Sequence, residues 1–449
     1  MFTLDILTSI CLMLLFALTL MLSLTYLLRS PFHFGYATVF LSSVFLLIPG
    51  WAWTMGQQEL FGYAFGKFPL ELLNRMDATV PFISLVVYTF CFLIGVVFGE
   101  KIAYSQREIG ISRPQISNGY LRMKALYILL WAFTAALIYM KSGLSLFEFI
   151  TPSRKDHDIY LSEYAKYVYI YFPLTLYFMN YLKTKRMTFV GSFWIAVSLL
   201  CALSTYQRRD FIIIFLFVVS TLVVIGRDSP LPGLRLRVAT QMKLVCWGIT
   251  GVALVPILWW ARVWATSRFR GDTETVVPWE VRGFFEIIFG GQATGFPTTL
   301  LIVNHQKEEG TQWFYSFLQV VTTPIPRSIW EGKPVLSDIV IEEYYNLAIN
   351  PSMFFINEVL FNFGPLTIPA VFVFGYAFGM LYKYLITTGS LTRKIVLCIL
   401  FSNIVTLFKN GFSSFFVMCF FLAIIFLVPT NYLLRKNKIR LTGWEDQPK

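Results

Sequence analysis

The sequence predicts an all-α protein that crosses a membrane many times. Hydrophobic residues make up 56% of the 449 residues and charged residues only 14%, whereas soluble domains carry about one quarter charged residues. Apolar runs such as 6–28 and 412–433 are almost free of charge. They reach the roughly 20 residues that a helix needs to cross a bilayer. Because lipid offers no partner for backbone N–H and C=O groups, these runs are predicted to be helices.

We expect about eleven membrane helices, within a range of about 10 to 12. In chain order they cover residues 6–28, 36–55, 79–99, 123–140, 164–182, 188–205, 211–226, 244–264, 365–385, 395–408 and 412–433. The chain is thereby divided into an N-terminal membrane bundle of about eight helices (1–264), a large outer loop (265–364), and about three C-terminal helices with a basic tail (365–449).

The large outer loop is predicted to contain short helices. Its segment 284–303 is apolar but is interrupted by glycine and proline, so we expect helical pieces that lie in the outer leaflet or dip into it. Further short helices are expected at 337–346 and 357–363. No repeat of the kind found in transporters with two related halves is visible.

The basic residues predict the orientation. Arginine and lysine residues gather in the loops on one side of the predicted helices, at Arg29, 101–124, 183–186, 227–243, 393–394 and 435–440. Basic loops favour the cytoplasm, so this side is predicted to be cytoplasmic. The net charge of +12 then reflects topology and gives no reason to expect nucleic-acid binding. An odd number of helices places the N-terminus on the outer side of the membrane and the C-terminus in the cytoplasm, and residues 1–5 lack the basic region of a cleaved signal peptide. With the family resemblance given below, this outer side is the periplasm.

The cysteines and acidic residues do not predict a metal site. All six cysteines lie in apolar runs without CxxC spacing, so they are expected to be packing residues. Asp156 and Asp158 flank His157 in a DxD pattern, but two carboxylates alone do not make a site for a divalent cation. We therefore expect neither a metal nor another cofactor.

Basic residues on the opposite, outer side are the candidate ligand-binding groups. Arg208 and Arg209 lie in a tight connection, YQRRD, and Arg327 follows two prolines in TPIPR. A guanidinium group binds a pair of phosphate oxygens bidentately and stays charged at any biological pH. The other outer candidates are Arg262, Arg268, Arg270, Lys333 and Lys409. Several such groups meeting in one place would bind a diphosphate. The alternative for each is a side chain that snorkels to the interface among Trp and Tyr residues.

Taken together, these motifs resemble the Wzy-type O-antigen or oligosaccharide repeat-unit polymerases. The resemblance is carried by YQRRD before the seventh predicted helix, the large outer loop, PIPRSIWEGKP at 324–334, and NEVLFNFGPLTIP at 357–369. The general architecture covers nearly the whole chain, while the specific motifs cover only 323–334 and 357–369. The resemblance implies an architecture like that of the GT-C membrane glycosyltransferases.

This resemblance also implies an activity at the periplasmic face of a bacterial inner membrane. A growing glycan would move from undecaprenyl diphosphate to the non-reducing end of a new lipid-linked repeat unit. The implied partners are undecaprenyl-diphosphate-linked oligosaccharides, membrane lipid, a Wzz-type chain-length regulator and a flippase. Arg209 and Arg327 are cast as catalytic residues, and Arg208 and Lys333 as diphosphate or glycan ligands.

The implied reaction needs cations and a base. Fixed cations stabilise the negative charge that builds up on the leaving phosphate, and the acceptor hydroxyl must lose its proton to a base within hydrogen-bond reach. His305, the histidine of the large loop, and Glu358 are the expected bases, with Asp338 and Glu342 as carboxylate alternatives.

Two other functions fit parts of the sequence. An O-antigen ligase would use the same lipid-linked donor with a different acceptor, such as lipid A core or a protein. A flippase for the lipid-linked glycan would call for charged residues near the middle of several spans, and these are scarce. Charge gathered at the outer surface favours catalysis.

Overall fold

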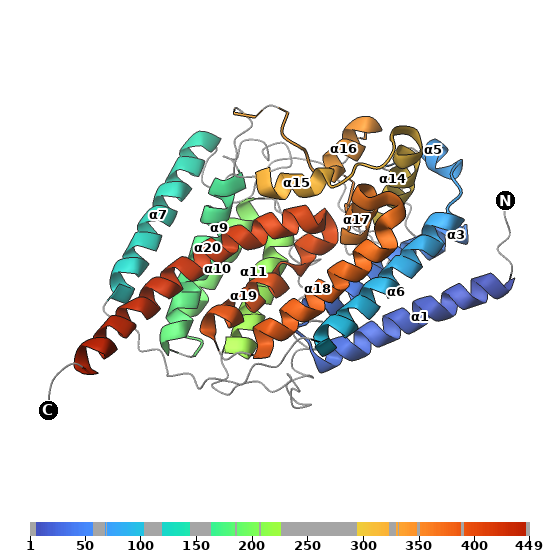
Figure 1. Cartoon of the computed structure of the whole chain (residues 1–449). Helices are drawn as coiled ribbons and strands as arrows, with labels where there is room; N and C mark the ends of the chain where they lie inside the picture. Colours follow the sequence, from blue (N-terminus) through green and yellow to red (C-terminus); the bar gives the residue numbers. More distant parts are fainter. Residues whose placement is uncertain are drawn as a thin grey trace.

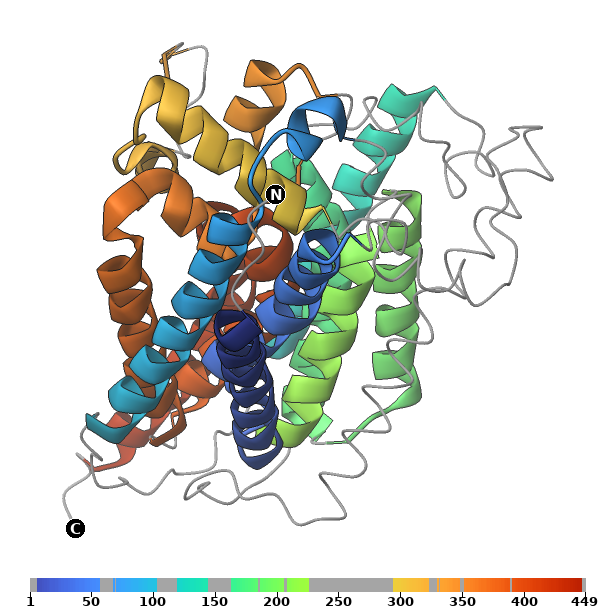
Figure 2. The same cartoon turned by 90° about the vertical axis from the view of Figure 1, so that its right-hand side faces the viewer.

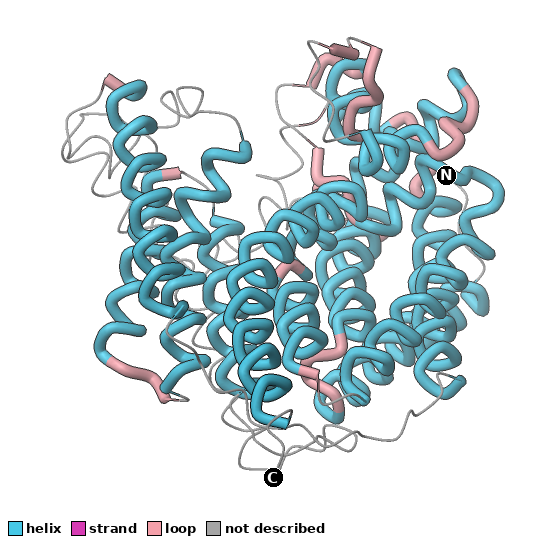
Figure 3. Tube along the Cα trace, turned by 60° about the vertical axis from the view of Figure 1, so that its left-hand side comes forward, coloured by secondary structure: helices cyan, strands magenta, loops and turns pink. Residues whose placement is uncertain are grey.

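The structure is a computed structural model of the chain, and every regular element in its described part is helical (Figure 1). The described residues are 6–56, 68, 70–102, 119–143, 163–184, 186–205, 208–225, 294–322, 329–330, 332–347, 351–387 and 390–445. Figure 3 traces helices through nearly all of this part, joined by short turns. The all-α prediction is confirmed for it. The predicted eighth helix, 244–264, lies outside the described residues.

Long apolar helices make this a polytopic membrane protein. Within the described residues, six helical segments have the length and composition needed to cross a membrane. They are Cys11–Arg29, Phe34–Thr54, Thr79–Ile102, Tyr120–Ser142, Phe355–Thr387 and Asn410–Tyr432. Each of the six overlaps a span expected from the hydropathy of the sequence, and Phe355–Thr387 also includes 357–363, which the sequence predicts as a short helix of the outer loop.

The helices follow one another in two groups along the chain. The first group is α1 (Ile6–Arg29), α2 (Phe34–Ser42), η1 (Ser43–Leu47), α3 (Ile48–Thr54), α5 (Leu70–Asn74), α6 (Thr79–Ile102), α7 (Gly119–Ser142), α9 (Glu163–Thr184), α10 (Phe189–Ser204), α11 (Arg208–Ser220) and η4 (Thr221–Ile225). The second is α14 (Gly295–Glu309), α15 (Tyr315–Thr322), α16 (Ser337–Tyr344), α17 (Phe355–Phe363), η5 (Gly364–Leu366), α18 (Thr367–Thr387), α19 (Leu391–Ser402) and α20 (Ile404–Glu445).

The two ends of the helical bundle differ in content. The short helices α14, α15 and α16 gather at one end, called here the upper end, which is at the top of Figures 1 and 2. Basic side chains mark the opposite, lower end. Arg29 and Lys101 lie in the last turns of α1 and α6, and Lys183 in the last turn of α9. Arg393, at the start of α19, stacks on Tyr384 near the end of α18.

Helices α6 and α18 pack backbone to backbone through four glycines. Gly95 and Gly99 on α6 face α18, and Gly375 and Gly379 on α18 face α6. A Cβ atom added at Gly95 would lie 2.3 Å from the carbonyl oxygen of Phe372, and one at Gly99 2.0 Å from that of Tyr376. Contacts advance along both helices in the same direction, so the pair is parallel. Glycines spaced four apart allow this close approach, a common device in membrane helices.

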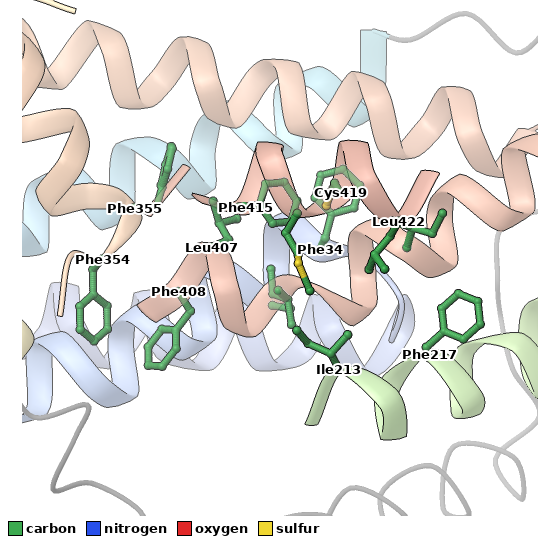
Figure 4. Close-up of a cluster of buried hydrophobic side chains, with 14 of the residues drawn as sticks. Phe34, Ile213, Phe217, Phe354, Phe355, Leu407, Phe408, Phe415, Cys419 and Leu422 are labelled. Atoms are coloured by element: carbon green, nitrogen blue, oxygen red, sulfur yellow. The ribbon is translucent and has the colours of Figure 1, made fainter. Parts of the chain in front are cut away.

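The core of the bundle is aromatic, and α20 runs through it. Figure 4 shows Phe354 and Phe408 side by side, with ring centroids 4.5 Å apart. Farther along, Phe217 of α11 stacks on Phe426 of α20 at 4.3 Å. Helix α20 is interrupted at Gly411, whose φ of 81° is non-helical. The helix therefore restarts at Phe412, where the predicted span 412–433 begins. The predicted span 395–408 is instead divided at Asn403 between α19 and α20.

Candidate functional site

Several of the predicted site residues lie outside the described residues, or have side chains that are not described. Arg262, Arg268, Arg270 and Arg327 lie outside the described residues, and the side chains of Arg208 and Lys409 are not described although their backbones belong to α11 and α20. Their placement relative to one another stays a prediction. Arg209, His305, Lys333 and Glu358 are described, and the site is built from them.

Arg209 lies beside a buried carboxylate in the first turn of α11. The Asp210 side chain is only 1% exposed, and its Oδ1 accepts a hydrogen bond of 2.9 Å from the hydroxyl of Tyr171 on α9. Nε of Arg209 lies 3.7 Å from the same oxygen, and the Arg209 side chain is 15% exposed. An acidic residue in the first turn is stabilised by the positive end of the helix dipole. The first turn of α11 thus holds a mostly buried cation next to an anchored anion.

The second oxygen of Asp210 is unusual. Oδ2 is buried and has no hydrogen-bond partner among the described residues, although buried polar atoms are nearly always paired. On α9, the rings of Tyr167 and Tyr171 lie 6.4 Å apart. Tyr167 also faces Phe421 of α20 at 5.9 Å. The Arg209 cluster therefore has an aromatic wall built from α9 and α20.

Glu358 is the centre of a second polar cluster, at the junction of α15, α17 and α20. Its Oε1 accepts hydrogen bonds from the hydroxyls of Ser316, at 2.9 Å, and Ser413. Its Oε2 accepts the backbone N–H of Phe412 and that of Ser413, the latter at 3.2 Å. These N–H groups begin the part of α20 after Gly411, where a helix has no acceptors of its own. The Glu358 carboxylate therefore caps this helix.

Two asparagines next to Glu358 in the sequence extend the same junction. Nδ2 of Asn362 donates to Oγ of Ser316 at 2.7 Å, and Oδ1 of Asn362 accepts the N–H of Ser316 at 3.1 Å. Nδ2 of Asn357 donates to the carbonyl of Gly295 at 2.8 Å, and Oδ1 accepts from Thr299 at 2.9 Å. The motif NEVLFNFG thus holds α14, α15 and α20 against α17.

His305 lies near the end of α14 and is buried. Its ring meets that of Tyr344 on α16 edge-on, with centroids 4.7 Å apart. Tyr344 in turn donates a hydrogen bond of 2.7 Å to Glu308. Burial lowers the pKa of His305, against the opposing influence of Glu309 and Glu308. The imidazole is therefore neutral near pH 7 and can accept a proton in principle, in surroundings that are acidic and aromatic.

Lys333 is partly exposed in the turn before α16, where its N–H donates to the carbonyl of Trp330 at 3.2 Å. Of the carboxylate alternatives, Asp338 is buried in the first turn of α16 and Glu342 is partly exposed. The DxD pattern at 156–158 lies outside the described residues. Among the described residues, no group of three or more His, Cys, Asp or Glu side chains could hold a metal ion.

Residue-type reasoning missed several members of these clusters. Asp210 directly follows the two arginines of YQRRD. The sequence prediction selected only the arginines, because a guanidinium group binds phosphate and a carboxylate does not. Tyr171 is one of several tyrosines in α9, and nothing in their spacing distinguishes it. Ser316 and Ser413 are separated from Glu358 by 42 and 55 residues, so no local pattern connects them.

The fold and these clusters define a class: a multi-pass membrane protein whose described elements are all helical, with buried polar clusters built around Arg209 and Glu358. Comparison with known proteins adds no closer identification. No protein-family model, curated protein or solved structure matches the chain.

Proposed function

We propose that the protein is a glycosyltransferase of the Wzy type, which polymerises undecaprenyl-diphosphate-linked oligosaccharide repeat units. It transfers the growing glycan from its lipid carrier to the non-reducing end of a new lipid-linked repeat unit. In this proposal about eleven helices cross a bacterial inner membrane. The upper end faces the periplasm and the basic lower end faces the cytoplasm.

The observation that carries this proposal is the Arg209 cluster. A mostly buried guanidinium beside an anchored carboxylate is an ordered cation in surroundings of low polarity, where electrostatic interactions are stronger than in water. Such a group can stabilise charge on a leaving diphosphate without having to reorganise. The extracytoplasmic placement of an Arg pair also runs against the general bias of basic residues toward the cytoplasm, which argues for a functional reason.

Two motifs that resemble those of Wzy-type polymerases, NEVLFNFG and PIPRSIWEGKP, support the same proposal. In NEVLFNFG, Asn357, Glu358 and Asn362 are all fully or almost fully buried and hydrogen-bonded to neighbouring helices. These three polar side chains hold the helices of the upper end together. This role explains why asparagine and glutamate occur in a segment that is otherwise apolar. The companion motif PIPRSIWEGKP contributes Arg327, whose role as a second diphosphate ligand is part of the proposal.

The ligase alternative uses the same donor and the same kind of cation, so it differs only in its acceptor. A flippase needs no chemistry at the anomeric carbon. These functions are separated by incubating purified protein in detergent with synthetic undecaprenyl-diphosphate-linked repeat units. A polymerase elongates them into chains of several repeats. A ligase elongates nothing until lipid A core or another acceptor is added, and a flippase leaves the lipid-linked units unchanged.

The site assignment is tested by Arg209→Ala and Arg327→Ala. Each variant is expected to lose about two decades in rate, to make no long-chain polymer in cells, and to leave single repeat units on the acceptor lipid. Arg186→Ala, an exposed arginine at the lower end, is the matched control and should polymerise normally. Normal chain lengths in both Arg209→Ala and Arg327→Ala, at unchanged protein level, would rule out the site.

A further inference from the structure

The proposed reaction needs a group that takes the proton of the acceptor hydroxyl, and the described side chains differ in their capacity to do so. A base must offer a lone pair to that hydroxyl within hydrogen-bond reach. In Glu358 both carboxylate oxygens already accept hydrogen bonds from Ser316, Phe412 and Ser413. Proton transfer to Glu358 would require breaking the cap of α20.

The acidic surroundings of His305 make it a poor neighbour for a diphosphate. Glu308 and Glu309 both act electrostatically on His305, and Glu308 is held within this group by Tyr344 and Asn304. The donor substrate carries its negative charge next to the reacting carbon, so a base close to that carbon needs cations beside it. Like charges near His305 would oppose binding of the diphosphate.

Asp210 satisfies both requirements. Its Oδ1 is held by Tyr171, while Oδ2 is buried with no hydrogen-bond partner among the described residues. The neighbouring side chain is Arg209, with Nε 3.7 Å from Oδ1, which is the cation assigned to the leaving diphosphate. We propose that Asp210 is the catalytic base: Oδ2 receives the acceptor hydroxyl and takes its proton. This inference rests on the proposed function.

Energetics favour a hydroxyl donor at this oxygen. A buried acceptor left without a donor costs free energy, and an acceptor sugar that donates to Oδ2 removes this cost. The hydrogen bond from Tyr171 fixes the carboxylate, so Oδ2 is already in place when the sugar arrives. Arg209 offsets the repulsion between the carboxylate and the diphosphate.

The reaction step balances as a simple substitution. The acceptor oxygen forms a bond to the anomeric carbon of the donor glycan while its proton moves to Oδ2 of Asp210. The bond between that carbon and the diphosphate oxygen breaks, and its electron pair leaves with undecaprenyl diphosphate, next to Arg209. Asp210 afterwards releases its proton to water, and no oxidant, reductant or metal is consumed.

The test is the rate of elongation of a synthetic undecaprenyl-diphosphate-linked repeat unit by purified Asp210→Asn protein. Asparagine keeps an oxygen that can accept from Tyr171 but cannot take a proton. We expect kcat to fall at least about 100-fold, with KM within a few-fold of wild type. Tyr171→Phe should lower kcat less, about tenfold, because the carboxylate remains but is no longer fixed. Asp77→Asn, at an exposed helix cap where asparagine serves equally well, is the control.

A purely positioning role for Asp210 predicts a different pattern. If Asp210 only orients Arg209, Asp210→Asn raises KM for the lipid-linked donor and leaves kcat close to that of the wild type. If Asp210 is the base, the variant loses kcat while KM for the donor stays within a few-fold of wild type. Melting temperature and size-exclusion elution verify that each variant is folded.

The outcomes separate this inference from the proposed function. Wild-type protein that elongates the substrate, together with Asp210→Asn protein whose kcat lies within about threefold of wild type, overturns the base assignment alone. Wild-type protein that elongates nothing overturns the proposed function and the base assignment with it.

Discussion

The hydroxyl of Ser316 donates a hydrogen bond of 2.9 Å to Oε1 of Glu358, joining α15 to α17 across 42 residues of sequence. The same carboxylate accepts the N–H groups that start the second part of α20, at Phe412 and Ser413. Three elements that are distant in the sequence therefore meet at one buried anion. The upper end of the bundle depends on this anion for its packing.

Replacing Glu358 with glutamine is expected to destabilise the folded protein. The amide NH₂ group would face the backbone N–H of Phe412 or the hydroxyl of Ser413, so at least one buried donor would lose its acceptor. Such a loss costs about 1–3 kcal/mol. Thermal unfolding of the purified protein in detergent, followed by tryptophan fluorescence, should show a lower melting temperature for Glu358→Gln.

Glu343→Gln, in an exposed position on α16, is the matched control and should unfold like the wild type. Ser316→Ala should destabilise less than Glu358→Gln, because it removes one donor and leaves the helix cap intact. The sequence also predicts Glu358 as a base. A variant that melts like the wild type but elongates far more slowly per folded molecule would support that prediction and contradict the structural role.

Long hydrophobic segments made most of the helices predictable. The runs at 6–28, 79–99 and 412–433 leave no alternative to a membrane helix. Helices α1 and α6 follow the first two closely, while α20 covers the third and continues to Glu445. Short elements such as α16 and α17 were predictable from local patterns: a possible cap at Ser337 with Asp338 and Glu342 four residues apart on one face, and an amphipathic pattern at 357–363. The close packing of α6 and α18 went unnoticed, although Gly95, Gly99, Gly375 and Gly379 carry its signature. The glycine spacing within one helix does not identify its partner, which lies 280 residues away in the sequence. Only the folded structure shows that these two helices pack together.

Residue chemistry identified Arg209, His305, Lys333 and Glu358 as polar groups of interest, but it could not assign their partners. Whether a buried carboxylate reacts or supports the fold depends on how many donors surround it, and for Glu358 these come from α15 and α20. For Asp210 the decisive partner is Tyr171, on another helix. Such information arises only when the helices pack.

Adding a methyl group at the α6–α18 contact is expected to destabilise the bundle. In Gly99→Ala the new Cβ would lie 2.0 Å from the carbonyl oxygen of Tyr376, and in Gly379→Ala 2.2 Å from that of Val96. Backbone atoms cannot move aside as a flexible side chain can, so the helices must separate. Overpacking of this kind costs about 1–3 kcal/mol, measurable as a lower melting temperature in detergent.

Gly191→Ala is the control for that experiment. A Cβ at Gly191 in α10 would lie 3.4 Å from its nearest neighbours, Nδ2 of Asn180 and Oγ1 of Thr188, which is close to ordinary contact. Alanine also favours a helix by up to about 1 kcal/mol, so this variant should melt at or above the wild-type temperature. Equal melting temperatures for Gly99→Ala, Gly379→Ala and the wild type would contradict the close helix contact.

Acid is expected to destabilise the lower end through His33. The ring lies between those of Tyr36 and Tyr382, with Nε2 3.9 Å from Glu100, and burial lowers the pKa of His33 from 6.5 to about 3. Between these two pKa values, His33 binds a proton in the unfolded chain but not in the folded chain. This contribution to the free energy of unfolding is complete above pH 6.5 and is lost as the pH falls toward 3.

The test of His33 is the slope of melting temperature against pH between about 7 and 5, the range in which an unfolded histidine gains its proton. His33→Asn keeps an acceptor for the N–H of Tyr36 at the start of α2 but does not titrate. It should be less stable at every pH, because the ring contacts are lost, yet show a shallower slope than the wild type. Identical slopes would mean that His33 does not carry the acid sensitivity.

Lysine in place of Arg209 should restore little of the proposed activity. The ammonium group of lysine keeps the positive charge, but as a point charge it cannot bind two phosphate oxygens with the planar fork of a guanidinium. It also lacks an Nε–H next to Oδ1 of Asp210, where Arg209 now lies at 3.7 Å. We expect Arg209→Lys to elongate lipid-linked repeat units at least about tenfold more slowly than wild type, since each tenfold loss corresponds to about 1.4 kcal/mol of transition-state stabilisation.

Arg186→Lys, at the exposed lower end, should keep the wild-type rate. A rate for Arg209→Lys equal to that of the wild type would show that charge alone suffices at this position, and that the fork geometry has no part in binding the diphosphate.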